Sequence, residues 1–332
     1  MRCDCQSKKA DTPPPNTIGW LQLLNRSRFP RFGAEYNNMV SRHCYLHADD
    51  LQCYISSPIS NITKAIETLN LDLQNICNWA QVNGLRVNPS KSKFIAIASR
   101  QLMSSININA LPEVVFNNTS IPLSTSVKNL GIILNQNLTW EEHVNIICRR
   151  AYAALHSLYR LKNFLPQTIK KTLVQSLVLT HLDYCDIALI DIPDELSRRL
   201  QRVQNACIRY IFNVKRYDHI SPYRRELGWM DVNARRSFRS LCALYKMLKF
   251  NQPVYLASRF QFLSDRHSLN TRSRDTKTLS FPSHKSSFYS KSFTVQTTRA
   301  WNEIPCNIRS SNSLEIFRSK LLAHFKEIYL SH

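Results

Sequence analysis

The pattern of apolar residues changes from strand-like to helical near residue 139, and this change constrains the fold more than any other feature. Before that point, short apolar runs bounded by turn residues predict strands, with one helix among them. After it, apolar residues recur at helical spacing over most of the remaining chain. The sequence therefore predicts an α+β protein, in which an antiparallel sheet with a packed helix precedes a mainly helical region.

The strand-rich part contains one sustained helical repeat. Apolar residues recur at helical spacing from Ile62 to Val82, and Gly84 is the expected C-cap because glycine readily adopts a left-handed conformation. This pattern predicts a helix of about 20 residues that packs on a sheet by one face. The expected strands lie on either side of residues 49–50 and at 91–98, 114–116, 121–123 and 130–134.

The second part predicts a succession of helices. Thr139 and Glu142 have the spacing of a capping box, which would open a helix that runs through Leu161. Pro166 and Pro193 can each begin a further helix, because proline is tolerated in the first turn. Further helices are expected at 232–250, with Arg235, Arg236 and Arg239 facing outward, and at 314–329; residues 258–298 are poorly periodic.

Charge is distributed unevenly along the 332 residues. The formal net charge is +21 and the isoelectric point is near 9.8. Residues 1–193 hold 19 Lys and Arg against 13 Asp and Glu, whereas residues 194–332 hold 25 against 10. This balance indicates a polyanionic partner, with nucleic acid first and an anionic membrane second. No apolar run is long enough to span a bilayer, so we expect no membrane partner.

The cysteine pattern predicts an intracellular protein and leaves nucleus or cytoplasm open. The ten cysteines are mostly single and scattered, and several lie within apolar helical patterns. Reduced, buried thiols fit this distribution better than a disulfide framework does.

Two adjacent acids, Asp49 and Asp50, interrupt the apolar and aromatic run at 45–55. Placing two carboxylates side by side in such a run is unfavourable unless a cation lies between them and a partner. A pair of Mg²⁺ ions in a nucleotidyl-transfer site would supply that cation. The alternative is a solvated turn that happens to carry two acids.

Four passages of the chain resemble the reverse transcriptases of non-LTR retrotransposons, specifically the jockey-like LINE elements. His47-Ala48-Asp49-Asp50 resembles the metal-binding box of that family, and residues 79–93 resemble the box that follows it. Residues 127–132 resemble the primer-grip hairpin. Downstream of the polymerase core, the resemblance continues at 181–185, 200–205 and 299–305.

The resemblance implies roles for particular residues. Asp49 would bind Mg²⁺ or Mn²⁺ with Asp50 as its partner, and Lys91 or Lys93 would neutralise or protonate the leaving pyrophosphate of an incoming dNTP. The primer terminus would be held by the hairpin residues Val127, Lys128, Leu130, Gly131 and Ile132. The partners would be an RNA template and a DNA primer, or their hybrid.

The resemblance also implies a thumb whose basic helix face follows the duplex. That face would consist of Arg198, Arg199, Arg202 and Arg209, since backbone contacts need only unpatterned charge. Each assignment has an alternative. The arginines could form a solvated helix face, Lys91 and Lys93 could protect a strand edge, and Gly131 could be a packing or bulge glycine.

The implied organisation is a disordered or unrelated leader at 1–40, a partial palm at 41–135, a helical thumb at 136–215 and a basic C-terminal region at 216–332. The chain departs from the family at His47, where Tyr or Phe is usual, and upstream, where Asp4, Asp11 and Glu35 are the only acids before Asp49. A second carboxylate strand and the fingers are not recognisable there. Positioning supplies most of the catalysis in phosphoryl transfer, so we expect no polymerisation by this chain alone.

Three hypotheses remain open on the sequence alone. The chain could be a truncated piece of a reverse transcriptase, a non-catalytic module that binds RNA or RNA–DNA hybrid, or a relic without function.

Overall fold

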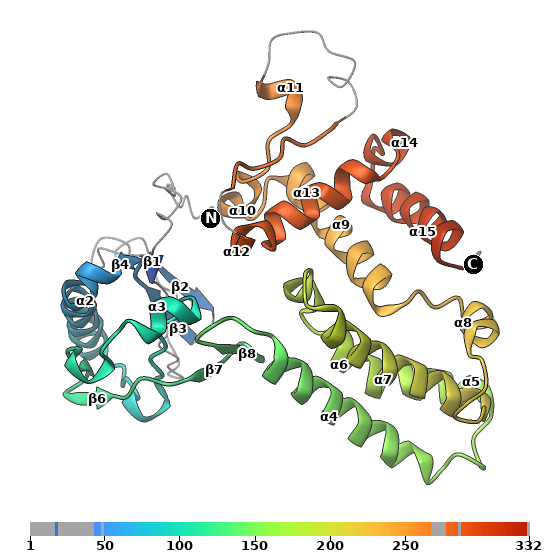
Figure 1. Cartoon of the computed structure of the whole chain (residues 1–332), viewed down its shortest axis with the longest axis horizontal. Helices are drawn as coiled ribbons and strands as arrows, with labels where there is room; N and C mark the ends of the chain where they lie inside the picture. The colour runs from blue at the N-terminus through green and yellow to red at the C-terminus, as the bar shows by residue number, and fades with distance from the viewer. Residues whose placement is uncertain (1–16, 19–42, 48–49, 267–276, 285–286, 331–332) are drawn as a thin grey trace. The chain divides into compact units, whose positions relative to one another are not determined.

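The computed structural model describes residues 17–18, 43–47, 50–266, 277–284 and 287–330 (Figure 1). The chain forms two compact units, Met1–Glu142 and His143–His332. All described strands belong to the first unit, whereas the regular elements described in the second unit are helices, apart from one bridge between Phe262 and Leu279. The protein is therefore α+β, with its strands preceding most of its helices.

The strands of the first unit form four two-stranded antiparallel sheets within the described residues. Three of these sheets are hairpins: β2 (His43–His47) with β3 (Asp50–Tyr54), β5 (Val114–Phe116) with β6 (Thr119–Ile121), and β7 (Ser126–Asn129) with β8 (Ile132–Asn135). The fourth pairs β1 (Thr17–Ile18) with β4 (Ser57–Pro58). The hairpins predicted around residues 49–50 and 117–119 are thus confirmed, although the strand predicted at 121–123 lies at Thr119–Ile121.

Two of the hairpin turns have positive φ at both central residues. These are Asn117 and Asn118 between β5 and β6, and Leu130 and Gly131 between β7 and β8. Such φ values match the twist of a two-residue hairpin, and asparagine and glycine adopt them at least cost. Leu130 and Gly131 therefore belong to a turn, and the strand predicted to start at residue 130 starts at Ile132.

The predicted helix at 62–82 is confirmed as α2 (Ile62–Val82). Gly84 follows it with φ +67°, and Leu85 N donates to Ala80 O at 2.8 Å, which closes the last turn. The buried face of α2 packs on β3, β5 and β6 in one apolar core. That core contains Leu51, Cys53, Ile66, Leu69, Leu73, Ile76, Cys77, Val114, Phe116 and Ile121.

The predicted strand at 91–98 is wrong. Its start belongs to the 3₁₀ turn η2 (Pro89–Lys91), and the segment makes one isolated bridge, from Phe94 to Leu123. Farther along, Ala98 N donates to Gln136 O at 3.0 Å. The apolar residues of this segment are buried with Val127, so their pattern reports burial and not a continuous ladder. The short elements η1 (Ile59–Asn61), α3 (Arg100–Ser104) and η3 (Ile108–Ala110) complete the unit.

The second unit begins with three helical segments that follow the predicted order. These are α4 (Glu141–Tyr159); the run α5 (Gln167–Leu173), η4 (Val174–Val178) and α6 (Leu179–Asp183); and α7 (Asp194–Phe212). Pro166 and Pro193 are the N-cap residues of α5 and α7, so each lies just before the first turn in which it was predicted. Leu196, Leu200, Val203, Cys207 and Tyr210 form the buried face of α7, which confirms the predicted core face.

The remaining helices follow in chain order. They are α8 (Ser221–Leu227), α9 (Val232–Phe250), α10 (Val254–Ala257), α11 (Leu263–Arg266), α12 (Ser287–Ser290), α13 (Phe293–Glu303), α14 (Cys306–Arg309) and α15 (Leu314–Leu330). Among them, α9, α13, α14 and α15 share a second core. The rings of Tyr245, Trp301 and Phe317 stack at its centre, with centroids 4.4 Å and 5.8 Å apart. The bounds predicted for α9 are confirmed, and the last helix ends one residue later than expected.

The prediction that three arginines of α9 face outward is wrong. Arg236 is buried, and Arg235 and Arg239 form ion pairs with Asp183. α9 packs on α13 and α15 with one side and on α7 and the 3₁₀ turn η5 (Asp186–Leu189) with another. Because two sides of the helix are covered, its polar stripe faces protein and not solvent.

The boundary between the compact units falls at 142/143, within the region predicted as a thumb at 136–215. The packing of α9 on α7 joins that region to residues 216–332 in one unit. Of the predicted leader at 1–40, only Thr17–Ile18 belongs to the described residues. Among the described residues, none of the helices has the length and apolar character needed to cross a bilayer.

Candidate nucleic-acid interface

The β2–β3 hairpin carries the acidic pair. Its register pairs His47 with Asp50, so the backbone of Asp50 begins β3, whereas Asp49 lies outside the described residues. Leu51 and Cys53 are 2% and 1% exposed and belong to the core under α2. Strand alternation places Gln52 and Tyr54 on the opposite, half-buried face.

A pair of amide side chains joins this hairpin to the β7–β8 hairpin. Gln52 Nε2 donates to Asn129 Oδ1 at 2.7 Å, and Asn129 Nδ2 donates to Gln52 Oε1 at 3.4 Å. Gln52 lies two positions after Asp50 in β3, and Asn129 is the last residue before the turn of Leu130 and Gly131. The two passages singled out as a metal box and a primer hairpin are therefore neighbours in space.

The residues of the predicted primer hairpin differ in accessibility. Lys128 is exposed, and Leu130 is 39% exposed at φ +43° beside Gly131 at φ +88°. Val127 is buried against Ile95 and Ile97, so this residue can offer a ligand only its backbone. The turn and Lys128 are the parts of the hairpin that a nucleic acid can reach.

The predicted pyrophosphate lysines flank a buried residue. Lys91 and Lys93 are exposed, whereas Ser92 between them is buried and donates to Asn88 O at 3.1 Å. This anchoring leaves both ammonium groups on the surface after the 3₁₀ turn. The structure brings neither lysine into a described contact with the acidic hairpin.

The arginines on the basic face of α7 differ in exposure and in their contacts. Arg198 and Arg202 are exposed, and Arg198 Nε donates to Asp194 O at 3.3 Å. Arg199 forms an ion pair with Glu195 at 2.6 Å and donates a hydrogen bond to Asn145 of α4 at 2.9 Å. The hydrogen bond from Arg199 to Glu195 lowers the pKa of the exposed Glu195 carboxyl. Arg209 donates to Lys215 O at 3.3 Å, which holds the connection after α7. Arg198 and Arg202 are thus the arginines of this face most available to phosphate.

The passage at 181–185 contributes to an ion-pair network. Asp183 and Asp186 accept from Arg235 and Arg239 of α9. Burial raises the pKa of the Asp186 carboxyl, and the positive charge of Arg239 opposes that rise. Through Asp183, this passage therefore contributes to the packing of the fold. No local pattern reveals this role, since the partners are more than 50 residues apart.

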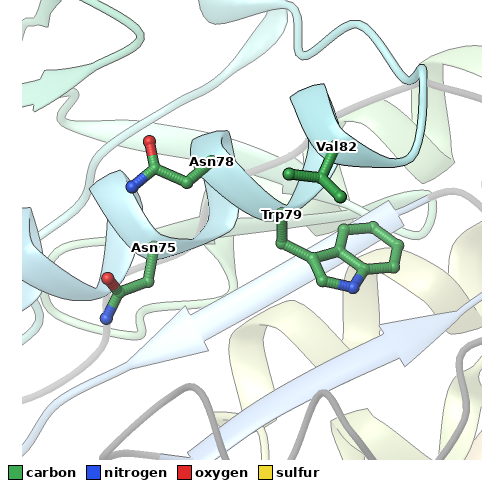
Figure 2. A pocket seen from close by; sticks show the side chains of 4 residues that line it. All are labelled: Asn75, Asn78, Trp79 and Val82. Atoms are coloured by element: carbon green, nitrogen blue, oxygen red, sulfur yellow. The ribbon is translucent and has the colours of Figure 1, made fainter.

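Sequence reasoning missed an accessible hollow on the outer face of α2. Figure 2 shows its lining by Asn75, Asn78, Trp79 and Val82. Val82 is 86% exposed and Trp79 is half-buried. The lining has amide and indole groups but no charged group. The sequence does indicate this hollow, because Trp79 and Val82 are apolar residues on the otherwise polar side of α2.

The described residues offer no cluster of three or more His, Cys, Asp or Glu side chains that could hold a metal ion. Asp49 and the side chain of Asp50 lie outside what the structure describes. The comparisons with known proteins give no match, either to a family model or to a curated protein.

Proposed function

We propose that this chain is a segment of a non-LTR retrotransposon reverse transcriptase and that its own activity is to hold RNA or RNA–DNA hybrid. The proposal combines the four sequence passages with the arrangement of their residues. In this assignment, the β2–β3 hairpin carries Asp49 and Asp50 for divalent cations, and the β7–β8 turn contacts the primer. The exposed arginines of α7 contact phosphates.

The observation that carries the proposal is the amide pair of Gln52 and Asn129, at 2.7 Å. In a polymerase, the primer terminus must lie beside the metal-binding acids, since the reacting atoms must be held a few ångströms apart. The pair joins two passages that are 77 residues apart in sequence. Nothing in the local sequence requires this contact, and proximity of the two passages is what the proposed assignment needs.

Charge supports the nucleic-acid part of the proposal. The chain has a formal net charge of +21, and Arg198, Arg202 and Lys128 are exposed. Phosphate contacts of this kind supply affinity without sequence preference. A second candidate, a binding module without chemistry, is favoured by these same exposed cations alone.

Binding to a labelled RNA–DNA hybrid over a range of salt concentrations tests the proposal. We expect the logarithm of the association constant to fall linearly with the logarithm of salt, by roughly 0.9 for each phosphate contact as in duplex DNA. The double variant Arg198→Glu/Arg202→Glu should bind more weakly and with a shallower slope. Lys64→Glu, an exposed change on α2, is the matched control. Salt-independent or absent binding would refute the proposal.

Primer extension tests whether the chain has chemistry of its own. The 332-residue chain is assayed alone on a primed RNA template with Mg²⁺ or Mn²⁺. We expect hybrid binding without extension from this chain. Extension that disappears in Asp49→Ala would instead show a complete polymerase. Extension that persists in Asp49→Ala would contradict the assignment of the acidic pair.

A further inference from the structure

Helices α4 and α7 lie alongside each other and run in the same direction (Figure 1). Arg199 Nη1 donates to Asn145 Oδ1 at 2.9 Å near the start of both helices. About three turns later, Tyr210 Oη donates to Leu158 O at 3.1 Å. Because the residue numbers rise together in both contacts, the two helices share a seam along most of their length.

Two tyrosines of α4 lie along this seam with rings partly open to solvent. Tyr152 is 42% exposed and Tyr159 is 41% exposed. They are seven residues apart, which places them on one face and about 10 Å apart along the helix axis at 1.5 Å per residue. The Tyr159 ring meets the buried Tyr210 ring edge-on at 5.2 Å, so its orientation is held by the core.

Each of these rings has a cation close to it. Burial raises the pKa of both tyrosines, and the charges of Arg202 and Arg209 oppose that rise at Tyr152 and Tyr159 respectively. Lys162 Nζ lies 5.7 Å from the centre of the Tyr159 ring. The seam therefore combines aromatic and basic residues. It consists of Tyr152, Tyr159, Lys162, Arg199 and Arg202, and Arg199 is paired with Glu195.

We propose that the α4–α7 seam binds single-stranded nucleic acid, with bases stacked on Tyr152 and Tyr159 and phosphates beside Arg202 and Lys162. This inference rests on the proposed nucleic-acid function and names the strand state that the second unit recognises. Aromatic platforms within a basic groove bind any unpaired base, because every base has a π face. At about 3.4 Å per nucleotide in one strand, the distance between the rings corresponds to about three nucleotides.

A blunt duplex would use the seam differently. Its bases are already stacked on one another, so it would present phosphates to the arginines and leave both tyrosine rings without a base. The seam therefore prefers an unpaired strand, and the preference comes from the tyrosines. The arginines contribute to the binding of both forms, since phosphate contacts do not distinguish them.

The test compares a labelled uridine oligonucleotide of about 15 nucleotides, close to the upper site size of single-strand binders, with a blunt duplex. Tyr152→Ala should weaken single-strand binding by about 5-fold or more, as expected for loss of one stacked base. It should leave duplex binding within about 2-fold, since no stacked base is lost there. Tyr152→Phe keeps the ring and should bind like the original chain.

Tyr217→Ala is the matched control, because Tyr217 is 90% exposed and lies outside both helices. Tyr159→Ala removes a ring contact with the core, so the thermal unfolding of this variant is measured first. If the Tyr159→Ala variant does not fold, the test uses the Tyr152 variants alone. If Tyr152→Ala weakened the binding of both ligands equally, or of neither, the proposed single-strand site at the seam would be overturned. Salt-dependent binding of the hybrid would in that case still support the proposed function. Absence of binding to either ligand by the unaltered chain would overturn both.

Discussion

Arg239 in α9 and Asp186 in η5 form an ion pair, with Nη1 2.8 Å from Oδ2. The Asp186 side chain is 7% exposed and that of Arg239 is 30% exposed. The same guanidinium reaches Asp183 at 2.8 Å, and Arg235 pairs with Asp183 as well. This network connects α9 to the segment between α6 and α7, and it makes the helical unit depend on charge pairing.

Removal of the arginine should destabilise the second unit. We expect Arg239→Met to lower the free energy of unfolding by about 3 kcal/mol, the lower end for a broken buried pair because Arg239 keeps some solvent. The exposed Arg198→Met should change it by no more than about 0.5 kcal/mol. Urea unfolding followed by circular dichroism measures both. Equal stability of the two variants would show that the network contributes nothing.

The destabilisation by Arg239→Met should depend on pH. Burial already raises the pKa of Asp186 above its ordinary value of 3.8, and loss of Arg239 removes the charge that opposes this rise. The native state of the variant then holds a proton at Asp186 that the unfolded chain releases, so its stability falls as pH rises between the two pKa values. Unfolding midpoints should differ most from those of the original chain near neutral pH and converge at acid pH. A difference independent of pH would contradict this account.

The contact between the two hairpins should appear as a coupling energy. Gln52→Ala and Asn129→Ala each remove one amide of the pair, and we expect an interaction free energy of about 1 kcal/mol in the double-mutant cycle. A control cycle combines Gln52→Ala with Asn78→Ala, since Asn78 is exposed on α2. Gln52 and Asn78 share no contact, so their coupling energy should be near zero. Coupling of the same size in both cycles would mean that the amide pair is not formed in solution.

Two cysteines of the second unit should differ sharply in reactivity. Burial raises the pKa of Cys207 to about 12, whereas Cys185 is exposed. The thiolate is the reactive form, so iodoacetamide at mildly alkaline pH should alkylate Cys185 in the native protein and Cys207 only after unfolding. Peptide mass spectrometry measures the extent of alkylation at each cysteine. Rapid labelling of native Cys207 would show that α7 is not packed as described.

The candidate site was predictable only in part. Exposure of Arg198 and Arg202 follows from the opposite, apolar face of α7, which the helical period reveals. The approach of the 49–50 and 127–132 passages was not predicted, and the residues that make it, Gln52 and Asn129, were not singled out. Their contact crosses 77 residues and depends on amides, which carry no periodic signal.

Short-range patterns in the sequence determined the bounds of α2 and α9 and the turn between β5 and β6. Helical period, the glycine after α2 and the turn residues Asn117 and Asn118 act within a few residues of one another. Tertiary structure alone decided that Arg236 is buried, that Arg239 pairs with Asp186, and that residues 91–98 are buried without forming a strand. In each case the outcome depends on what packs against the segment, because charge is tolerated inside only where a distant partner meets it and a ladder forms only beside another strand.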